Sequence, residues 1–225
     1  MVKNHLKKLA SPRSWRVKRK SEKYITRPNT GGHCLENAMA LSVIFKNILK
    51  VAKTTKEAKY ILNEKEVLIN GKKKKNHRLP IGLFDLIDLT ETGARYVVLI
   101  DNKGKLVAKE HDPKSLMISK VKDKKLIKGK INLMLYNGWN ILTDNKDIKT
   151  NDSVLIDPKT RKIKETIKFE KGATVLLVGG RHIGATGNIE NINDGKVIIN
   201  IDENMIETSK DFVYVIGKDK PYIEM

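Results

Sequence analysis

The apolar residues of this 225-residue chain occur mostly in short runs that turn signals separate, and this spacing limits what the chain can fold into. After residue 105 the candidate strands lie at 116–118, 131–135, 153–156 and 163–169, and then at 173–178, 187–192, 196–201 and 212–216. Asn137-Gly138, Asn151-Asp152 and Asp157-Pro158 mark turns between them. Strands of this length favour small β-barrels or sandwiches over one large core.

Only residues 35–62 show a helical period. Their apolar stripe consists of Ala38, Leu41, Ile44, Phe45, Ile48, Leu49 and Ala52. The stretch from Thr54 to Glu57 predicts a break and a new N-cap, with a second short helix running through Leu62. Next comes a strand that enters the Asn70-Gly71 turn. The predicted class is therefore α+β and multidomain.

The chain carries 45 Lys+Arg against 26 Asp+Glu, a formal net charge of +19. Because a body so charged repels itself, we expect a polyanionic partner: nucleic acid, an anionic membrane surface or an acidic protein. No apolar run approaches the ~20 residues that cross a bilayer. The first residues lack the apolar core, roughly 7–15 residues long, of a secretory signal. The single cysteine, Cys34, excludes an internal disulfide and fits a reducing compartment.

The cations are densest in residues 1–30, which we expect to be a poorly cored extension that orders against its partner. Between Lys3 and Arg27 lie ten Lys/Arg and one acid, Glu22. Trp15 and Tyr24 either pack on the body or stack on a base. The candidate RNA-binding residues of this segment are Lys3, His5, Lys7, Lys8, Arg13, Trp15, Arg16, Lys18, Arg19, Lys20 and Arg27.

A second group of cations follows. Lys46, Lys50 and Lys53 are predicted on the exposed face of the first helix, and Lys72, Lys73, Lys74, Lys75 and Arg78 follow the Asn70-Gly71 turn. Such residues bind phosphates and release counterions, so affinity should fall steeply with salt, while contributing little sequence information. The alternative for the run Lys72 to Lys75 is a solvated charged face.

The glycine-rich segment 179–187 allows three interpretations. No Lys-Ser or Lys-Thr follows its glycines as a P-loop requires, and residues 188–190 lead into a strand rather than the helix of a dinucleotide site. We therefore expect a loop whose glycines permit positive φ or a close backbone approach. Arg181 and His182 either reach RNA from this loop or belong to a purely architectural turn; Lys218 and Lys220 are further candidates.

Catalytic signals are weak. Cys34 and the dispersed histidines do not converge as metal ligands, so neither a metal site nor a cofactor is expected. Asp85 and Asp88 favour turn or helix-end roles over an acid/base pair. No Ser/His/Asp arrangement is visible. For Trp139 we favour a core position over a stacking platform.

Nine stretches, taken together, resemble the archaeal and eukaryotic small-subunit ribosomal protein family S four e. They are 5–15 (HLKKLASPRSW), 27–33 (RPNTGGH), 44–52 (IFKNILKVA), 69–72 (INGK), 80–87 (PIGLFDLI), 151–157 (NDSVLID), 169–172 (FEKG), 179–187 (GGRHIGATG) and 215–221 (VIGKDKP). Cys34 and the run Lys72 to Lys75 depart from the family pattern, and no long basic tail follows Pro221. The compact length and missing tail fit an archaeal source.

The resemblance implies four regions: a basic N-terminal region (1–38), an RNA-binding domain of the ribosomal S-four type (39–104), a central β domain (105–170) and a C-terminal SH3-like KOW barrel (171–225). It implies a cytoplasmic structural protein of the small ribosomal subunit that binds ribosomal RNA beside neighbouring small-subunit proteins. We expect no catalytic residues, membrane, small-molecule substrate or homo-oligomer. The alternatives are an RNA-modifying enzyme, or a translation or transcription factor, that carries an S-four-type or KOW module.

Overall fold

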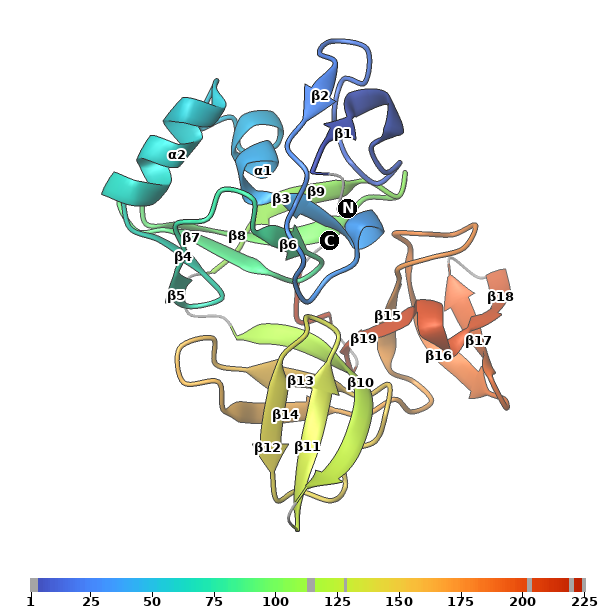
Figure 1. The fold of residues 1–225 in the computed structure, drawn as a ribbon. Coiled ribbons are helices and arrows are strands. Elements are labelled where there is room, and N and C mark those ends of the chain that lie inside the picture. Colours follow the sequence, from blue (N-terminus) through green and yellow to red (C-terminus); the bar gives the residue numbers. More distant parts are fainter. Residues whose placement is uncertain (1–3, 113–115, 128, 202–203, 219–220, 224–225) are drawn as a thin grey trace. The chain divides into compact units, whose positions relative to one another are not determined.

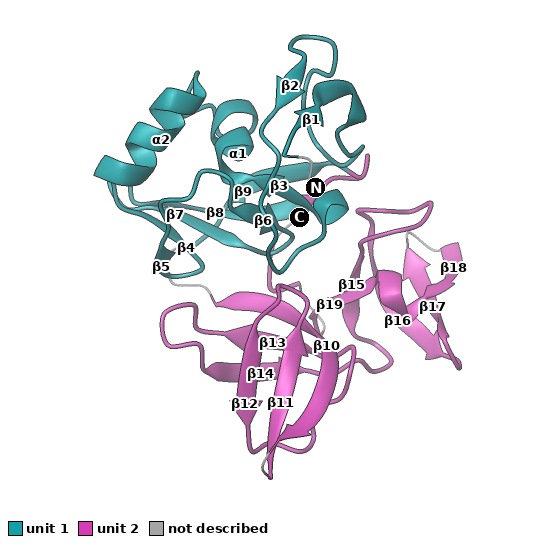
Figure 2. Cartoon of the chain, in the orientation of Figure 1, with its two compact units in different colours: residues 1–99, 105–115 teal, residues 100–104, 116–225 magenta. Residues whose placement is uncertain are grey.

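The computed structural model describes residues 4–112, 116–127, 129–201, 204–218 and 221–223 (Figure 1). The chain divides into two compact units (Figure 2). Unit 1 comprises residues 1–99 and 105–115, and unit 2 comprises residues 100–104 and 116–225. The described residues are mostly β, with two α-helices and several sheets, which agrees with the predicted α+β class.

Unit 1 is built on a sheet with two helices on one side of it (Figure 1). The strands, in sheet order, are β5 (Lys72–Lys73), β4 (Val67–Ile69), β7 (Leu86–Leu89), β8 (Ala94–Ile100) and β9 (Leu106–Glu110). The helices are α1 (Leu41–Asn47) and α2 (Thr55–Glu64). Ile44, Phe45 and Leu62 from the helices share one apolar core with Val67 and Val98 from the sheet.

The helix α2 begins where the sequence predicts an N-cap. Thr54 Oγ1 accepts a hydrogen bond from the Glu57 backbone N–H at 3.1 Å. The Glu57 carboxylate in turn accepts from the backbone N–H of Lys53 at 2.7 Å. This arrangement resembles a capping box and satisfies N–H groups that a helix start leaves unpaired. The predicted break and second helix are confirmed.

The first helix is shorter than predicted. Residues Ala38–Ala40 form the strand β3, which pairs with β6 (Pro80–Gly82). The helix α1 ends at Asn47. Lys50 has a left-handed φ of 56°, which no helix continues through. The prediction of one helical stripe from Ala38 to Ala52 is therefore wrong at both ends, because strand pairing and the turn at Lys50 override local helical spacing.

The start of α1 fixes a later segment of the chain against it. Ala40 supplies no side-chain cap, and the backbone N–H groups of Leu41 and Ser42 donate to the carbonyls of Leu79 and His77 at 2.9 Å each. These bonds satisfy backbone N–H groups that a capping side chain would otherwise satisfy. As a result, the segment around His77 lies at the N-terminus of α1.

Residues 4–37 are folded onto unit 1 and are not a poorly cored extension. β1 (Leu6–Lys7) pairs with β2 (Tyr24–Ile25), and short 3-10 turns span Lys8–Ala10 and Leu35–Asn37. The indole N–H of Trp15 donates to the Ala38 carbonyl at 2.8 Å. Trp15 is 1% exposed and belongs to the core of the unit. One large aromatic side chain thus anchors this basic segment to the body.

Unit 2 contains two five-stranded antiparallel sheets. The first runs in the order β12 (Asn140–Thr143), β11 (Lys130–Leu135), β10 (Met117–Ile127), β13 (Ser153–Ile156) and β14 (Ile163–Ile167). The second runs in the order β18 (Asn204–Ser209), β17 (Lys196–Ile201), β16 (Thr186–Ile192), β15 (Thr174–Leu177) and β19 (Val213–Gly217), with a 3-10 turn at Lys210–Phe212.

Lys120 joins the two sheets of unit 2. This buried lysine on β10 donates from Nζ to the carbonyls of Lys210 (2.9 Å) and Val213 (2.8 Å). Its backbone N–H donates to the Tyr214 hydroxyl. Burial lowers the pKa of Lys120 to about 8, and the charge of Asp211 opposes that shift. The ammonium is therefore a structural donor inside unit 2.

Among the described residues, no helix has the length and apolar character needed to span a membrane.

Candidate nucleic-acid interface

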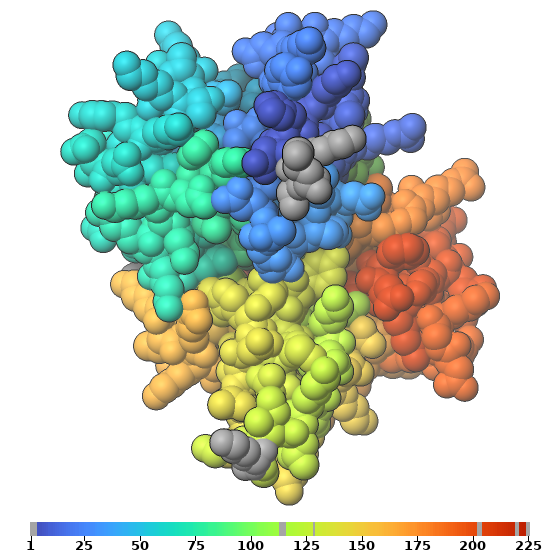
Figure 3. Space-filling model, viewed as in Figure 1, coloured from blue at the N-terminus to red at the C-terminus, as the bar shows by residue number. Residues whose placement is uncertain are grey.

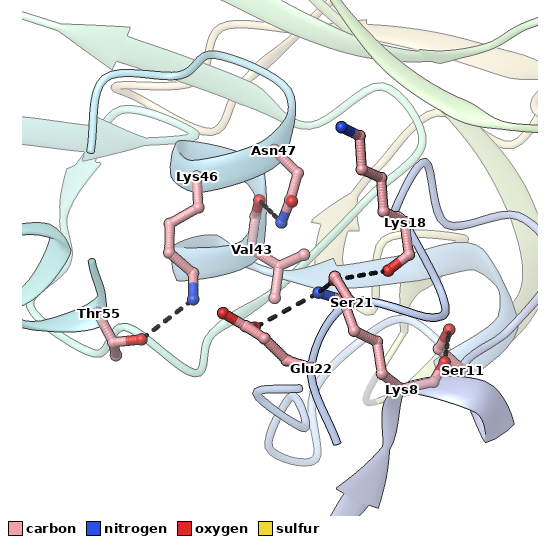
Figure 4. A network of polar contacts seen from close by, with 9 residues as sticks. All are labelled: Lys8, Ser11, Lys18, Ser21, Glu22, Val43, Lys46, Asn47 and Thr55. Atoms are coloured by element: carbon pink, nitrogen blue, oxygen red, sulfur yellow. Dashed lines mark hydrogen bonds and ion pairs between the residues drawn. The ribbon is translucent and has the colours of Figure 1, made fainter. Parts of the chain in front are cut away.

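Lys8 is a cation that the fold uses for itself. Its side chain is buried and its Nζ donates to Ser21 Oγ at 2.6 Å, with Glu22 Oε2 at 3.4 Å (Figure 4). The Ser21 hydroxyl in turn donates a hydrogen bond to the Lys18 carbonyl at 2.9 Å. Because the Lys8 ammonium is buried and paired, the prediction that Lys8 contacts RNA does not fit the structure.

Arg19 and Trp15 also serve the N-terminal segment. The Arg19 guanidinium donates to the carbonyls of Leu9 (3.2 Å), Ser11 (2.8 Å) and Pro12 (2.8 Å), and so holds the turn that precedes it. Guanidinium groups suit this role because they carry five donors in a rigid fork. Trp15 has no exposed ring face for a base. For Trp15 the structure supports an internal role in place of the predicted RNA contact, whereas for Arg19, which is half-buried, that contact stays a prediction.

Other cations of the segment remain on the surface. Six of them are exposed: His5, Lys7, Arg13, Arg16, Lys18 and Lys20. Arg27 is half-buried. Tyr24 is 48% exposed, with the Lys23 ammonium 5.5 Å from its ring centre and the His5 ring at 5.7 Å. Of the two aromatic residues, Tyr24 therefore keeps the exposure that base stacking needs. Lys3 lies outside the described residues.

The lysine run follows a confirmed turn. Asn70 and Gly71 have φ of 50° and 74° and connect β4 to β5, the geometry that an Asn-Gly hairpin adopts. Lys72, Lys73, Lys74 and Lys75 are all exposed. This turn positions four cations in succession at the edge of the unit 1 sheet.

Charges from other elements lie near His77, two residues after this run. Burial lowers the pKa of His77, and so do the positive charges of Lys59 on α2 and of Arg78. Arg78 Nε donates to the Arg27 carbonyl at 3.0 Å, which brings the N-terminal segment to the same place. Lys59 was not among the predicted residues, because only the tertiary fold brings its charge near His77.

The three cations predicted for the first helix do not share one helical face. Only Lys46 lies on α1, and its Nζ donates to Thr55 Oγ1 at 3.2 Å (Figure 4). Lys50 and Lys53 are exposed in the connection between the helices. The premature end of α1 at Asn47 explains the difference, although Lys50 and Lys53 keep their accessibility.

In unit 2 the glycine loop combines architecture with exposed charge. Gly184 has a φ of 83°, and a Cβ there would lie 2.5 Å from the Asp101 carbonyl oxygen, so only glycine fits. Arg181 and His182 are nevertheless exposed. Lys218 lines a surface hollow of about 440 Å³ with Lys168 and Lys171, two cations that the sequence did not single out. Lys220 lies outside the described residues.

Sequence reasoning missed two further surface features that depend on tertiary contacts. The end of the β10–β11 hairpin presents Leu126, 73% exposed, among the exposed residues Lys125 and Lys130. Trp139 is half-buried, with the Arg161 guanidinium 4.4 Å from its ring centre. The prediction of a core position for Trp139 is therefore wrong. Arg161 meets the ring from a left-handed turn (φ 58°) that local sequence does not reveal.

A buried polar network ties the N-terminal segment to the sheet. His33 Nε2 lies 2.9 Å from Asp85 Oδ2, and both side chains are 4% exposed. Asp85 also accepts from the Gly82 backbone N–H (2.8 Å) and from Asn70 Nδ2 (2.7 Å). Burial lowers the pKa of His33, but the charge and hydrogen bond of Asp85 outweigh it, and the pKa is raised overall. This network fixes the strand ends beside the basic segment.

Within the described part of the chain, no three His, Cys, Asp or Glu side chains converge as a metal site would need. Asp85 is committed to the network above, and Asp88 forms an ion pair with Arg95 at 2.5 Å. The arrangement offers cations, exposed aromatic faces and hydrogen-bond donors, which are the groups that bind nucleic-acid backbones and unpaired bases.

Comparisons with known proteins agree along the whole chain. Residues 92–163 match the model of the Ribosomal family S4e, and residues 2–36 match the RS4NT (NUC023) domain. A small ribosomal subunit protein eS4 of Methanosphaera stadtmanae is 37% identical over 98% of this chain and 95% of its own length. That of Archaeoglobus fulgidus is 34% identical over 100% of this chain and 99% of its own length.

A solved structure is similar as well. The crystal structure of 30S ribosomal protein S4e from Thermoplasma acidophilum superposes with a TM-score of 0.72 at 28% identity, covering 83% of this chain and 99% of that protein. Full-length identity above 30% to several relatives, together with the family-model matches, establishes the relationship that the nine sequence stretches indicate. The chain therefore belongs to the S4e family of ribosomal proteins, whose curated members are named small ribosomal subunit protein eS4.

Proposed function

We propose that this chain is a structural constituent of the small ribosomal subunit, in the cytoplasm, and that it binds ribosomal RNA through exposed basic surfaces. Its curated relatives carry the name of a small-subunit protein, and none of the names quoted above describes an enzyme. The observation that carries the binding mode is the exposed run Lys72 to Lys75, which leads along the chain to His77, where the charges of Lys59 and Arg78 also act. Such a surface suits phosphates far better than a neutral substrate.

The RNA-contacting residues we propose are those that the fold leaves accessible. They are His5, Lys7, Arg13, Arg16, Lys18, Lys20, Arg27, Lys50, Lys53, Lys72, Lys73, Lys74, Lys75, Arg78, Arg181, His182 and Lys218. We add Lys59, Lys168 and Lys171, which packing brings beside them. We leave out four residues whose polar groups are bonded inside unit 1, namely Lys8, Trp15, Arg19 and Lys46. Lys3 and Lys220 lie outside the described residues.

The finer domain assignment is part of this proposal. An S-four-type RNA-binding domain would occupy residues 39–104, and a KOW-type barrel residues 171–225, with a β domain between them. The two helices against the unit 1 sheet support the first assignment, and the separate five-stranded sheet from β15 to β19 supports the second. The described part of the basic region, residues 4–38, contributes Trp15 to the core of unit 1. Neighbouring small-subunit proteins complete the proposed set of partners.

The salt dependence of binding tests the basic surface. Each lysine that neutralises a phosphate contributes up to ~0.9 to the slope of log affinity against log salt on duplex-like RNA. We therefore expect the variant with Ala at positions 72 to 75 to bind small-subunit ribosomal RNA more weakly and with a flatter slope. Filter binding at several salt concentrations measures both quantities, with the ribosomal RNA of Methanosphaera stadtmanae as the probe.

A matched pair of double variants controls for the loss of charge. Lys74→Ala/Lys75→Ala removes two unpaired cations beyond the strand β5, whereas Lys65→Ala/Lys196→Ala removes two cations already paired with Glu91 (2.6 Å) and Glu207 (3.1 Å). Both pairs change the net charge equally. Equal slopes for the two variants would mean that the lysine run faces solvent in the complex. Sedimentation of the wild-type chain apart from the small subunit at moderate salt would contradict the structural role itself.

A further inference from the structure

A hollow of about 610 Å³ in unit 1 lies beside the lysine run and is lined by cationic, amide, hydroxyl and apolar groups. Its walls come from two stretches, residues 27–35 and 76–80, with Asn4 and Ala38. Sites for small ligands in proteins typically measure about 300–1,000 Å³, so the hollow has room for one nucleotide. This inference rests on the proposed binding of ribosomal RNA and specifies one mode of it.

The lining supplies each kind of group that an unpaired nucleotide needs. Arg27 and Arg78 provide positive charge, and no Asp or Glu occurs among the described residues that line the hollow. Asn29, Thr30 and Asn76 carry amide and hydroxyl groups that can donate to and accept from base edges and a ribose 2′-hydroxyl. Pro28, Leu79 and Pro80 give apolar walls for the face of a base.

The two walls are held together by bonds within the chain. The Asn29 backbone N–H donates to the Arg78 carbonyl at 2.8 Å, and Arg78 Nε donates to the Arg27 carbonyl at 3.0 Å. The Arg78 backbone N–H donates to Asn76 Oδ1 at 2.9 Å. A Cβ at Gly31 would lie 2.4 Å from Pro80 Cγ, so the walls meet closely there. The hollow is thus preformed and needs little rearrangement to bind a ligand.

The surroundings point to a polymer. The exposed cations Lys72 to Lys75 lead along the chain directly to Asn76 at the rim, and the blue N-terminal segment lies against the same unit in the space-filling view (Figure 3). A free nucleotide would occupy the hollow but leave the lysine run unused, and an acidic peptide would leave the amides and apolar walls without matching groups. A continuing phosphodiester chain uses both the hollow and the lysines.

We propose that the hollow receives one unpaired nucleotide of small-subunit ribosomal RNA, turned out of its helix. The base lies between the apolar walls and bonds to Asn29, Thr30 or Asn76. Its flanking phosphates meet Arg27 and Arg78, and the strand continues along Lys72 to Lys75. Folded RNA offers such splayed bases in loops and bulges, and proteins read them by stacking and by their hydrogen-bonding edges.

Site-specific crosslinking tests the proposal with the full chain in the assembled small subunit. A photoreactive phenylalanine derivative replaces Thr30 at the hollow, and the same derivative replaces Thr92, an exposed threonine outside the hollow. The expected result is a crosslink from position 30 to one unpaired nucleotide of the ribosomal RNA, and none to that nucleotide from position 92. A crosslink from position 30 to a neighbouring protein, to duplex RNA or to nothing would overturn the proposal.

A substitution that fills the hollow with a larger side chain tests the proposal independently, through the affinity for RNA. Thr30→Trp should lower the affinity for the ribosomal RNA by about tenfold, the effect of losing one base contact, while the salt slope stays unchanged because no cation is lost. Thr92→Trp should bind as the wild-type chain does, and circular dichroism confirms the fold of both variants. Wild-type affinity in Thr30→Trp would refute the nucleotide site. Absence of binding by the wild-type chain would instead refute the underlying RNA-binding function.

Discussion

At the scale of single residues, the buried pair of His33 and Asp85 links protonation to the stability of unit 1. Taking an imidazolium out of water is costly unless a counter-charge meets it. Asp85 supplies that charge at 2.9 Å, while Asn70 and the Gly82 backbone satisfy its remaining lone pairs. Removal of His33 would leave the buried Asp85 charge with its hydrogen bonds alone, whereas without Asp85 burial would favour the neutral form of His33. The pair therefore behaves as one unit that holds residues 31–34 on the sheet.

The raised pKa of His33 predicts a loss of stability with rising pH. Unfolded His33 releases its proton near pH 6.5, whereas folded His33 keeps it to a higher pH. Its contribution is complete below about pH 6.5 and is lost as the pH rises through the folded pKa, with a slope of at most about 1.4 kcal/mol per pH unit. Urea denaturation between pH 6 and pH 8 measures the effect.

Two variants assign this dependence to the pair. His33→Gln should reduce the pH dependence, since the titrating group is gone. In Asp85→Asn the remaining influence on His33 is burial, which lowers its pKa, so stability should rise with pH over the same range. If both variants keep the wild-type slope, another group is responsible.

Residue types in the sequence predict which kind of chemistry is present but not which individual cation performs it. Lys8 and Lys7 are neighbours, yet only Lys8 is buried, because its partners Ser21 and Glu22 lie 13 and 14 residues further along the chain. Arg19 likewise differs from Arg16 through its contact with the carbonyls of residues 9–12. These contacts depend on how the segment folds back, which local patterns do not contain.

At the scale of elements, the cap of α2 is a feature that the sequence predicts and the structure confirms. Thr54→Ala removes the acceptor for the Glu57 backbone N–H and should lower the free energy of unfolding by about 1 kcal/mol. Thr54→Ser keeps the hydroxyl and should retain most of the stability. Guanidinium denaturation, followed by the helical circular dichroism signal, compares them. Equal losses in both variants would show that the threonine methyl, and not the cap, matters.

The sequence predicted well the elements that depend on local alternation and turn residues. It did not predict the elements that form only by pairing with strands far away in the sequence. The strand β17 and the Asn70-Gly71 hairpin follow from alternation and turn residues. By contrast, β3 reads as helix locally and becomes a strand through its partner β6, some forty residues away. β10 reaches Ile127 although residues 122–125 are all charged, because β11 supplies the ladder bonds. At the candidate site, the Asn70-Gly71 turn made the position of the lysine run predictable from the sequence. The position of Lys59 near His77 depends on the tertiary fold and was not predictable.

At the scale of the whole molecule, a net charge of +19 makes the free chain repel itself. The described surface ion pairs, such as those of Lys65 and Lys196, are exposed and offset little of this repulsion. Added salt screens the repulsion. We therefore expect a rise from low to about 0.3 M NaCl to stabilise the RNA-free chain by about 1 kcal/mol, or roughly 2–4 °C in Tm.

Differential scanning fluorimetry of the purified chain measures this shift. Repeating the measurement with ribosomal RNA present should reverse its sign, because salt weakens the complex that stabilises the fold. A Tm that falls with salt in the absence of RNA would indicate that attractive pairs dominate the surface.

The edge strand β5 affects how the free chain behaves before it assembles with RNA. A sheet edge offers unpaired backbone groups to any passing strand, and short, lysine-bearing edges discourage such pairing. β5 is two residues long and both residues, Lys72 and Lys73, are exposed lysines. The side chains that we assign to RNA would thus also keep newly made copies of the protein from joining sheet to sheet, so that solubility and assembly depend on the same charges.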